Sequence, residues 1–384
     1  DYVAQANKKY SFESRIRAIV GKNISNRLED QVAKGFTYLP RGCAIEMDKL
    51  AQQYILDNIQ GAIWNSRRLI NEVMHYRQNF KDELTLSNFL AHFNLDPRAL
   101  YKSTCWSELL RNGNELSYED DAYTDVFAKN MYRLVHVNSI GYIRFMQKLI
   151  SDGFTYEHNK VNDIYALMLY YALYAAPLPK SGVGSVEEGL RIFGAHQCFV
   201  EELRELLDYI VNNLNVNTRL IPELGGLPLE LFGCYTREEQ LIILGKITAD
   251  KTFNPQSGVY TIEESNTELL WVTLNKNDKD FSERTQYNDY AINESLFHWQ
   301  SQNSASHNTK SGRRYVEQKE NHKTFLLLVR EHKNDGYGFT EPYYLLGPVT
   351  YRSSQGDKPM SITWEMKYHM PVFILDKAMK QAVG

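Results

Sequence analysis

The sequence has few cysteines and few prolines for its length. Its 384 residues include 11 prolines and four cysteines. The cysteines are far apart and form no CxxC pair, which argues against a zinc site or a disulfide framework. Their spacing instead predicts reduced, buried thiols in a cytosolic protein. The four residues are Cys43, Cys105, Cys198 and Cys234.

Long apolar runs are also missing. The longest, Ile164–Ala176, is shorter than the ~18 residues that a membrane-crossing helix requires, and it predicts a buried helix instead. No signal-peptide pattern is present. We therefore expect a cytoplasmic protein without a membrane partner. The sequence begins at Asp1 without an initiator methionine, so we expect it to be part of a longer chain.

Common catalytic motifs are absent as well. The sequence contains no GxxxxGK[ST] phosphate loop, no HExxH metal motif and no GxSxG elbow. The segment "HNKVND", His158 to Asp163, is similar to the phospholipase-D signature HxKx4D. Only two residues separate its Lys160 from Asp163, so we interpret it as a loop between helices. The sequence predicts no catalytic residue, metal or cofactor in this chain.

The overall composition is that of a globular protein, with an excess of tyrosine. Hydrophobic residues make up 43% of the chain and charged residues 23%, which is enough for a sizeable core. The 26 tyrosines suit wet interfaces as well as cores, because each ring carries a polar tip. The net charge of −4 excludes a polyanion-binding surface over the whole protein but allows a local basic patch.

The first part of the chain has the periodicity of helices. Apolar residues recur at three- and four-residue spacing over Met47–Arg77, as in a helix with one buried face. Ser185, with Glu188 three residues later, predicts a capping box that opens one long helix to Leu214. The segment Asn215–Gly233 is rich in Asn, Pro and Gly, and we place a domain boundary there.

Beyond this boundary the pattern changes from helical to strand-like. Thr236 and Glu239 predict a capped helix that stops at Gly245. Six short runs with period-two alternation follow, separated by turn residues: "GVYTIEE", "ELLWVTLNK", "SLFHWQSQ", "TFLLLVREH", "PYYLLGPVTYRS" and "MSITWEMKY". We predict an α+β protein with a helical domain at 1–232 and a strongly curved sheet or barrel with flanking helices at 233–384.

One predicted strand carries an unusual set of side chains. In "SLFHWQSQN" the residues His298, Gln300 and Gln302 fall on one side of the pleat, and Phe297 and Trp299 fall on the other. The region that follows, 307–333, contains seven Lys or Arg residues and three Glu residues, a local charge of +4. Aromatic faces, amides and cations in one segment are the groups that bind nucleic-acid bases and phosphates.

The same segments resemble a known family. The stretch "LLWVTLNKNDKDFSERTQYNDYAINESLFHWQSQNSASHNTKSGRRYV", with "TFLLLVREHK", "YYLLGPV" and "KPMSITWEM", resembles the C-terminal module of SauUSI-type, ATP-dependent Type IV restriction endonucleases of bacteria. Members of that family join a phospholipase-D-type nuclease, a superfamily 2 helicase and this module. The upstream "YLPRGCAIEMDKLAQQYILDNI" and "LTLSNFLAHFNLDPRALYK" resemble the segment after the helicase.

The resemblance implies a fold, a partner and a division of labour. It implies an SRA/PUA-like target-recognition domain that flips a modified cytosine of double-stranded DNA, 5-methylcytosine or 5-hydroxymethylcytosine, into a pocket. It implies that the helical domain is a coupler to the helicase and nuclease domains of the same parent chain. ATP and Mg²⁺ would serve only the motor, which this chain lacks.

Candidate DNA-contacting residues follow from side-chain chemistry, because the eukaryotic SRA pocket motif does not align residue by residue. Stacking on the flipped base is assigned to aromatic rings and its polar edge to amides and a carboxylate. The base-pocket candidates are Tyr287, Asp289, Tyr290, Trp299, Gln300, Gln302 and Asn303, and the DNA-backbone candidates are Lys310, Arg313, Arg314 and Lys319.

Two alternatives remain at the level of the sequence. The chain could be a protein-interaction module that docks a helicase onto a partner subunit, with the aromatic strand as an adhesive edge. It could also be a hydrolase that acts through an unrecognised site. For each aromatic residue taken singly, a place in the core is the competing interpretation.

Overall fold

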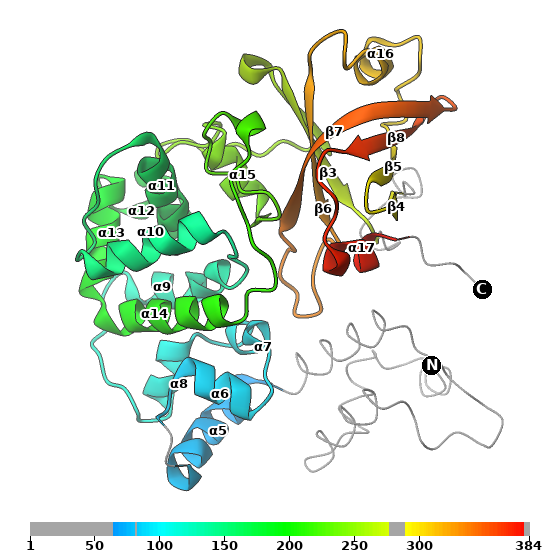
Figure 1. Cartoon of the computed structure of the whole chain (residues 1–384). Coiled ribbons are helices and arrows are strands. Elements are labelled where there is room, and N and C mark those ends of the chain that lie inside the picture. The colour runs from blue at the N-terminus through cyan, green and yellow to red at the C-terminus, as the bar shows by residue number, and fades with distance from the viewer. Residues whose placement is uncertain (1–63, 81–82, 276–288, 380–384) are drawn as a thin grey trace, which may run out of the picture.

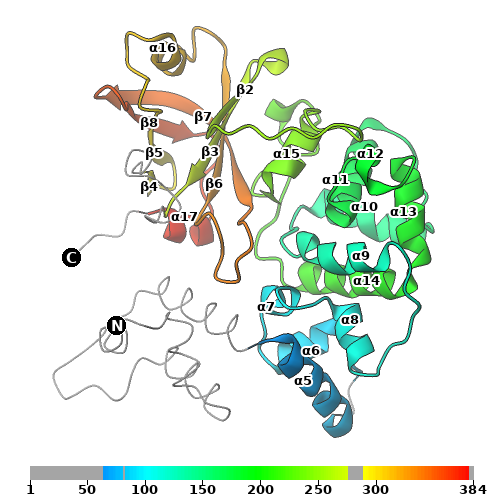
Figure 2. The same ribbon diagram turned by 180° about the vertical axis from the view of Figure 1, so that it is seen from behind.

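A computed structural model describes residues 64–80, 83–275 and 289–379. Its first part is helical, and its second part is built around one sheet (Figure 1). Both views place α15 between the helices and the sheet (Figure 2). The helical elements before the sheet are α5 (Ser66–Asn79), α6 (Leu86–His92), α7 (Pro97–Tyr101), α8 (Trp106–Asn112), α9 (Thr124–Asn130), η1 (Met131–Leu134), α10 (Ile140–Ser151), α11 (Lys160–Tyr174), α12 (Leu178–Ser181), α13 (Val186–Ala195), α14 (Gln197–Asn212) and η2 (Pro222–Leu224).

The sequence predicted several of these helices, with one error. The apolar run Ile164–Ala176 lies mainly in α11, most of whose side chains are buried, and this prediction is confirmed. Ser185 caps α13 by accepting a hydrogen bond from the Glu188 amide at 3.1 Å. The single long helix predicted to run to Leu214 is wrong, because the chain breaks at His196 and continues as α14. Residues 47–63 of the first predicted helix lie outside the described residues.

Two acidic side chains of α14 hold neighbouring helices by their N-termini. Glu202, which is fully buried, accepts hydrogen bonds from the amides of Trp106 (2.9 Å) and Ser107 (2.8 Å) at the start of α8. Glu205 accepts from the amide of Leu86 at the start of α6. These amides have no partner inside their own helices, so the carboxylates complete the ends of α8 and α6.

The second part forms an eight-stranded mixed sheet with the order β2-β3-β6-β7-β8-β5-β4, and β1 pairs with β7. The β3–β6 pair is parallel and the other pairs are antiparallel. The strands are β1 (Cys234–Tyr235), β2 (Val259–Ile262), β3 (Thr267–Thr273), β4 (Tyr290–Asn293), β5 (Leu296–Gln300), β6 (Thr324–Arg330), β7 (Tyr343–Gln355) and β8 (Ser361–Met366), and the helices between and after them are α15 (Arg237–Ile243), η3 (Glu263–Ser265), α16 (Lys310–Val316) and α17 (Val372–Ala378).

The predictions for this part are mostly confirmed. All six strand-like runs contain a strand, and the Thr236–Glu239 capping box is present at the start of α15. The sheet is not a closed barrel over the described residues, since its end strands β2 and β4 are not paired with each other. Strand β4 was not among the predicted runs. It contains only Tyr290–Asn293, which is too short for a clear alternating pattern.

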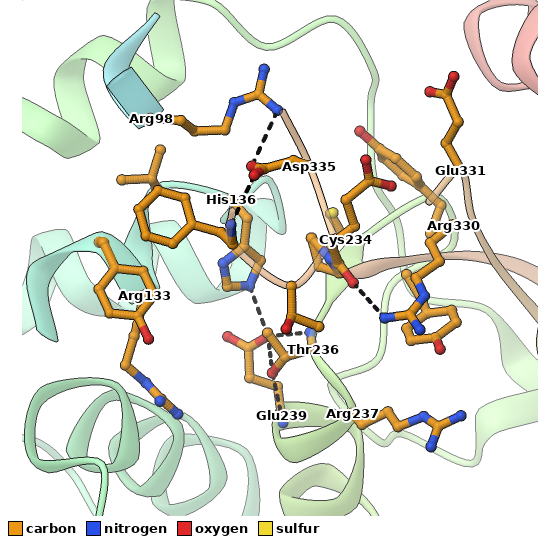
Figure 3. Close-up of a pocket in the computed structure, with 18 of the residues that line it drawn as sticks. Arg98, Arg133, His136, Cys234, Thr236, Arg237, Glu239, Arg330, Glu331 and Asp335 are labelled. Atoms are coloured by element: carbon orange, nitrogen blue, oxygen red, sulfur yellow. Dashed lines mark hydrogen bonds and ion pairs between the residues drawn. The ribbon is translucent and has the colours of Figure 1, made fainter. Parts of the chain in front are cut away.

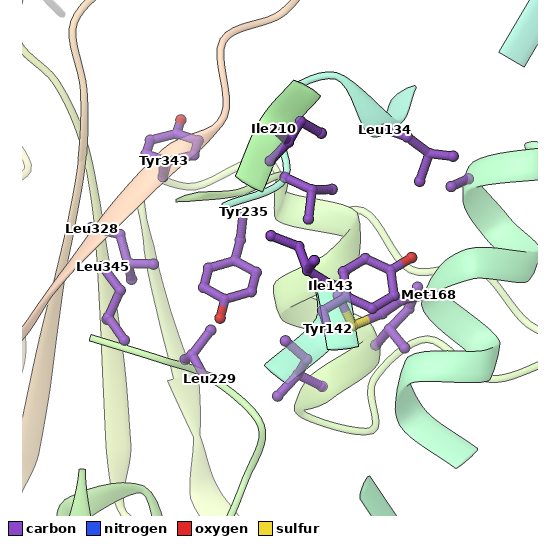
Figure 4. Packing of buried hydrophobic residues seen from close by; sticks show 14 of the residues in the cluster. Leu134, Tyr142, Ile143, Met168, Ile210, Leu229, Tyr235, Leu328, Tyr343 and Leu345 are labelled. Carbon is purple, nitrogen blue, oxygen red and sulfur yellow. The ribbon is translucent and has the colours of Figure 1, made fainter. Parts of the chain in front are cut away.

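The segment that joins the two parts is tightly packed rather than a free linker. Glu230 is buried and accepts hydrogen bonds from the amides of Ile140 (3.0 Å) and Gly141 (2.7 Å) at the start of α10. Two residues later, the Phe232 amide donates to the Leu345 carbonyl of β7 at 2.8 Å. Apolar side chains from both parts meet around Tyr235 in one continuous core (Figure 4). This joining segment, which we call the joint (residues 215–233), therefore connects the helices to the sheet through hydrogen bonds and a shared core.

No helix among the described residues is long and apolar enough to cross a membrane.

Candidate nucleic-acid interface

The two faces of strand β5 have different surroundings. Phe297 and Trp299 are buried, with exposed fractions of 0% and 5%, whereas His298 and Gln300 are only half-buried. The predicted alternation along this strand is therefore confirmed. We call the side with Trp299 the inner face of the sheet and the side with His298 the outward face.

The inner face is an aromatic core covered by helices. The Trp299 ring lies 5.2 Å from that of Tyr315 of α16 and 6.2 Å from that of Trp364 of β8, measured between centroids. Tyr315 and Trp364 are themselves fully buried. Further along the same face, Phe373 of α17 packs against Tyr344 of β7 at 5.6 Å. Trp299 is thus part of the core, as the competing interpretation of the sequence held.

The outward face presents polar and aromatic side chains in a row across four strands. Tyr290, His298, Thr363 and Ser353 stand directly opposite one another on β4, β5, β8 and β7. The rings of Tyr290 and His298 are stacked, with centroids 4.7 Å apart and planes 17° apart. Cross-strand neighbours share a face, so these side chains form one continuous surface.

A second polar row lies beside the first. Gln300, Ser361 and Gln355 face one another across β5, β8 and β7. Arg352, at the bulge in β7, lies 3.8 Å from Glu365 and is more than half exposed. Amides, hydroxyls, an aromatic pair and a guanidinium occur together on this side of the sheet. These are the groups that hydrogen-bond to base edges and stack on bases.

The residues predicted to form the base pocket do not all lie on the same face of the sheet. Tyr290 and Trp299 lie on opposite faces of the sheet, so they cannot both stack on one base; the prediction that they share a pocket is corrected. Asp289 is buried, and its carboxylate accepts a hydrogen bond from the Gln300 amide at 2.9 Å. Gln302 accepts from the Tyr315 hydroxyl at 3.0 Å, whereas Asn303 is exposed. Tyr287 lies outside the described residues.

The predicted basic loop is in fact partly a helix. Thr309 caps α16 by accepting from the Gly312 amide at 3.1 Å, and the helix then carries Lys310, Arg313 and Arg314. A Cβ on Gly312 would lie 1.9 Å from the Ser306 carbonyl oxygen, so only glycine allows this close approach. The helix was not foreseen, because seven residues with a glycine inside are too few for a clear period.

The four backbone candidates separate into two kinds. Lys310, Arg313 and Lys319 are exposed, and none of their side chains has an ion-pair partner among the residues that the structure describes. Arg314 instead lies 3.4 Å from the buried carboxylate of Glu268. This ion pair engages the guanidinium of Arg314, whereas the other three candidates have no such partner in the described part of the chain.

One arrangement near this helix was not foreseen from the sequence. His307 Nε2 lies 2.8 Å from the Ser354 hydroxyl, and its Nδ1 lies 3.0 Å from Asp357. The Asp357 carboxylate also accepts from the His307 amide at 2.8 Å, and this hydrogen bonding lowers the pKa of Asp357. The Ser354 oxygen is shared with the Tyr351 hydroxyl at 2.7 Å. These contacts fasten the tip of the β7–β8 hairpin to the segment before α16.

The segment with the phospholipase-D-like spacing is a helix start. Asn159 caps α11, and His158 Nδ1 lies 2.8 Å from Asp163 on the exposed surface. Within the described ranges, no group of His, Cys, Asp or Glu side chains has an arrangement that could hold a metal ion.

Comparison with known proteins adds one match. Residues 229–378 match the model of a family described as a domain of unknown function, DUF3427. That domain is found in helicase-associated proteins. The match spans the end of the joint, α15, the sheet and α17, which is less than half of the chain. No curated protein matches the chain.

Proposed function

We propose that the sheet-containing part of this chain is the DNA-binding target-recognition region of a modification-dependent restriction endonuclease. Its target would be double-stranded DNA that contains 5-methylcytosine or 5-hydroxymethylcytosine. The observation that carries the proposal is the outward face, where Tyr290, His298 and Gln300 lie on adjacent strands with further polar groups beside them. The sequence resemblance supplies the class of target, and the matched domain agrees with a helicase-associated role.

The Tyr290–His298 pair would provide the stacking surface for a flipped base. Stacking on an aromatic side chain contributes ~1–3 kcal/mol per base and does not depend on methylation. Gln300, two residues after His298 on the same side of β5, would contact the polar edge of the base. The inner-face Trp299 would act only by supporting β5 from behind. In this proposal the domain is SRA-like, with α16 and α17 covering the inner face.

The exposed cations of α16 would contact phosphates. Because α16 lies on the inner face and the Tyr290–His298 pair on the outward face, one duplex would have to pass around the border of the sheet to contact both. Lys310 and Arg313 of α16, and Lys319 just after it, would then hold one strand while the outward face binds the displaced base. The helical part would couple this binding to a helicase motor and a nuclease that are not in this chain.

Base flipping is the step to test first. A duplex with 2-aminopurine next to the modified cytosine should gain fluorescence when the protein binds, since flipping unstacks the probe. Tyr290→Ala should keep its circular dichroism spectrum, bind the modified duplex more weakly by the ~1–3 kcal/mol of one stacked base, and give no fluorescence gain. The matched control is Tyr260→Ala, which removes a half-buried tyrosine of β2 at the other end of the sheet. Tight binding without any fluorescence change in the unmodified protein would contradict the flipping step.

A further inference from the structure

The helical part and the sheet enclose a cavity of about 880 Å³, whose lining includes none of Tyr290, His298 and Gln300. Its walls come from α7, η1, α14, α15, the β6–β7 loop, the start of β7 and α17. Several charged side chains line it (Figure 3). The volume of this cavity falls within the range of volumes that small-molecule binding pockets have in proteins.

The carboxylates of this cavity are already paired. Glu238 pairs with Arg133, and Glu239 lies 2.9 Å from His136. Asp335 lies 3.6 Å from Arg98, which also binds Asp96; Glu331 lies 2.9 Å from Lys377; and Glu341 lies 3.6 Å from His332. These pairs link the helices to the sheet and α15.

Arg237 lines the cavity but belongs to none of these pairs. No carboxylate within the described residues forms an ion pair with it, and its Nε is buried without a hydrogen-bond partner there. Its guanidinium carbon lies 4.4 Å from the centre of the Trp271 ring, and one terminal nitrogen approaches the Pro255 carbonyl at 3.4 Å. A buried donor without a partner is costly, so the guanidinium has hydrogen-bonding capacity that the described residues leave unused.

A second guanidinium lies close by. Arg330 stands 4.5 Å and Arg237 5.7 Å from the centre of the Tyr343 ring. Arg330 donates to the Thr273 hydroxyl (2.9 Å) and to the Glu341 carbonyl (3.2 Å), which fixes its orientation. Figure 3 shows both arginines on the side of the cavity opposite Arg133. Two oriented guanidiniums around one aromatic ring make this wall cationic.

We propose that this wall of the cavity binds the phosphate group of a small phosphorylated molecule, with Arg237 as its main contact and Arg330 as the second. A guanidinium binds phosphate with two parallel hydrogen bonds, and a phosphate monoester carries nearly two negative charges at pH 7. Two neighbouring cations therefore match it better than they match a single carboxylate. The rings of Trp271 and Tyr343 hold Arg237 in place. The site is separate from the proposed DNA contacts.

Calorimetric titration of the whole chain tests this proposal with inorganic phosphate, pyrophosphate and adenosine monophosphate, each against sodium chloride of equal ionic strength. We expect saturable binding of at least one phosphate compound and a raised melting temperature in its presence. Arg237→Gln should weaken binding at least tenfold, and Arg237→Lys should weaken it less, because lysine keeps the charge but not the planar fork. Arg144→Gln, which removes an exposed cation of α10, should bind like the unmodified protein.

The outcomes separate the proposal from a structural role for Arg237. Absence of saturable binding to the unmodified protein would overturn it, whether or not Arg237→Gln folds. Equal phosphate affinity in Arg237→Gln and Arg144→Gln would overturn it as well. If Arg237→Gln lost DNA affinity while the small phosphates failed to bind, the cavity would hold a strand of nucleic acid instead, and the small-molecule site would be refuted. Loss of DNA binding in Tyr290→Ala with phosphate binding intact would support the cavity site and leave it independent of the outward face.

Discussion

Arg314 of α16 reaches the buried carboxylate of Glu268 on β3, with its Nε 3.4 Å from Oε2. Lys323 approaches the other carboxylate oxygen at 3.3 Å. Glu268 is fully buried, so the two cations compensate a charge that water cannot reach. The neighbouring Arg313 is exposed and has no such partner among the described residues. Two adjacent arginines therefore have different roles, one internal and one on the surface.

Arg314→Ala should destabilise the protein more than Arg313→Ala. Removing one partner of a buried ion pair costs ~3–5 kcal/mol, and we expect the lower end, about 3 kcal/mol, because Lys323 still faces Glu268. Arg313→Ala should change the free energy of unfolding by less than ~0.5 kcal/mol, as an exposed substitution does. Urea denaturation followed by tryptophan fluorescence measures both. Equal stability of the two variants would show that the Glu268 pair contributes nothing.

The exposed cations of α16 and the turn after it should determine part of the salt dependence of DNA binding. For the double variant Arg313→Ala/Lys319→Ala, the plot of log affinity against log salt should become flatter by roughly 0.9 for each phosphate that is no longer neutralised. Modified and unmodified duplexes should bind more weakly to the same extent, because backbone contacts carry no sequence information. Arg144→Ala/Lys160→Ala removes two exposed cations from the helical part and serves as the control. An unchanged slope in the double variant would show that Arg313 and Lys319 do not contact DNA phosphates.

The two faces of the sheet should respond differently to removal of an aromatic ring. Trp299→Ala should cost ~3–5 kcal/mol of stability, because the ring is 5% exposed and packs against Tyr315 and Trp364. Tyr290→Ala should leave the fold intact and weaken DNA binding by the ~1–3 kcal/mol of one stacked base. Thermal unfolding and fluorescence anisotropy distinguish the two effects. If Trp299→Ala were as stable as the unmodified protein and impaired only in DNA binding, Trp299 would be a base-contacting residue and not a core residue.

Local pattern was sufficient to predict strands and helix starts. The alternation of Phe297 and Trp299 with His298 and Gln300 is a property of the pleat itself, and the cap at Thr236 depends on residues three apart. The break at His196 was missed because the apolar spacing continues through it. The order of the strands could not be predicted, since β5 pairs with β8 and not with β6, its next predicted neighbour along the chain.

The candidate site was harder to predict than the strands. The sequence places Tyr290 and Trp299 close together along the chain, but only the β4–β5 register shows that they face opposite sides. Likewise, nothing near Arg314 indicates that its partner is Glu268, which lies far away in the sequence and is brought near by the position of α16 on the inner face. Contacts distant in the sequence decide which charged groups remain available for DNA.

The stability of the helical part should fall as the pH rises from about 4.5 to about 7. Burial raises the pKa of Glu205 to about 7, against an ordinary value of 4.5, although its bond from the Leu86 amide acts in the other direction. Between these two values the folded protein holds a proton that the unfolded chain has released, so each step up in pH favours unfolding. The decline is complete once the pH passes the folded pKa.

Glu205→Gln tests this pH dependence, because glutamine keeps the acceptor for the Leu86 amide but does not titrate. We expect the variant to be more stable than the unmodified protein at pH 8 and to show a flatter profile between pH 5 and 7 in thermal unfolding. Glu119→Gln, at an exposed position of the same part, is the control and should follow the unmodified profile. Identical profiles for all three proteins would refute a raised pKa at Glu205.

The most direct test of the central proposal compares two duplexes that differ only by a methyl group on one cytosine. Fluorescence anisotropy at one fixed salt concentration measures the affinity of the whole chain for each. A close-fitting site distinguishes a methyl-sized group by ~1–3 kcal/mol, so we predict a preference for the methylated duplex of about tenfold or more. The preference should disappear in Tyr290→Ala, because without the stacking ring the flipped base is no longer held in the site that distinguishes the methyl group, and it should persist in Arg313→Ala. Equal affinity of the unmodified protein for both duplexes, or no binding to either, would contradict the account.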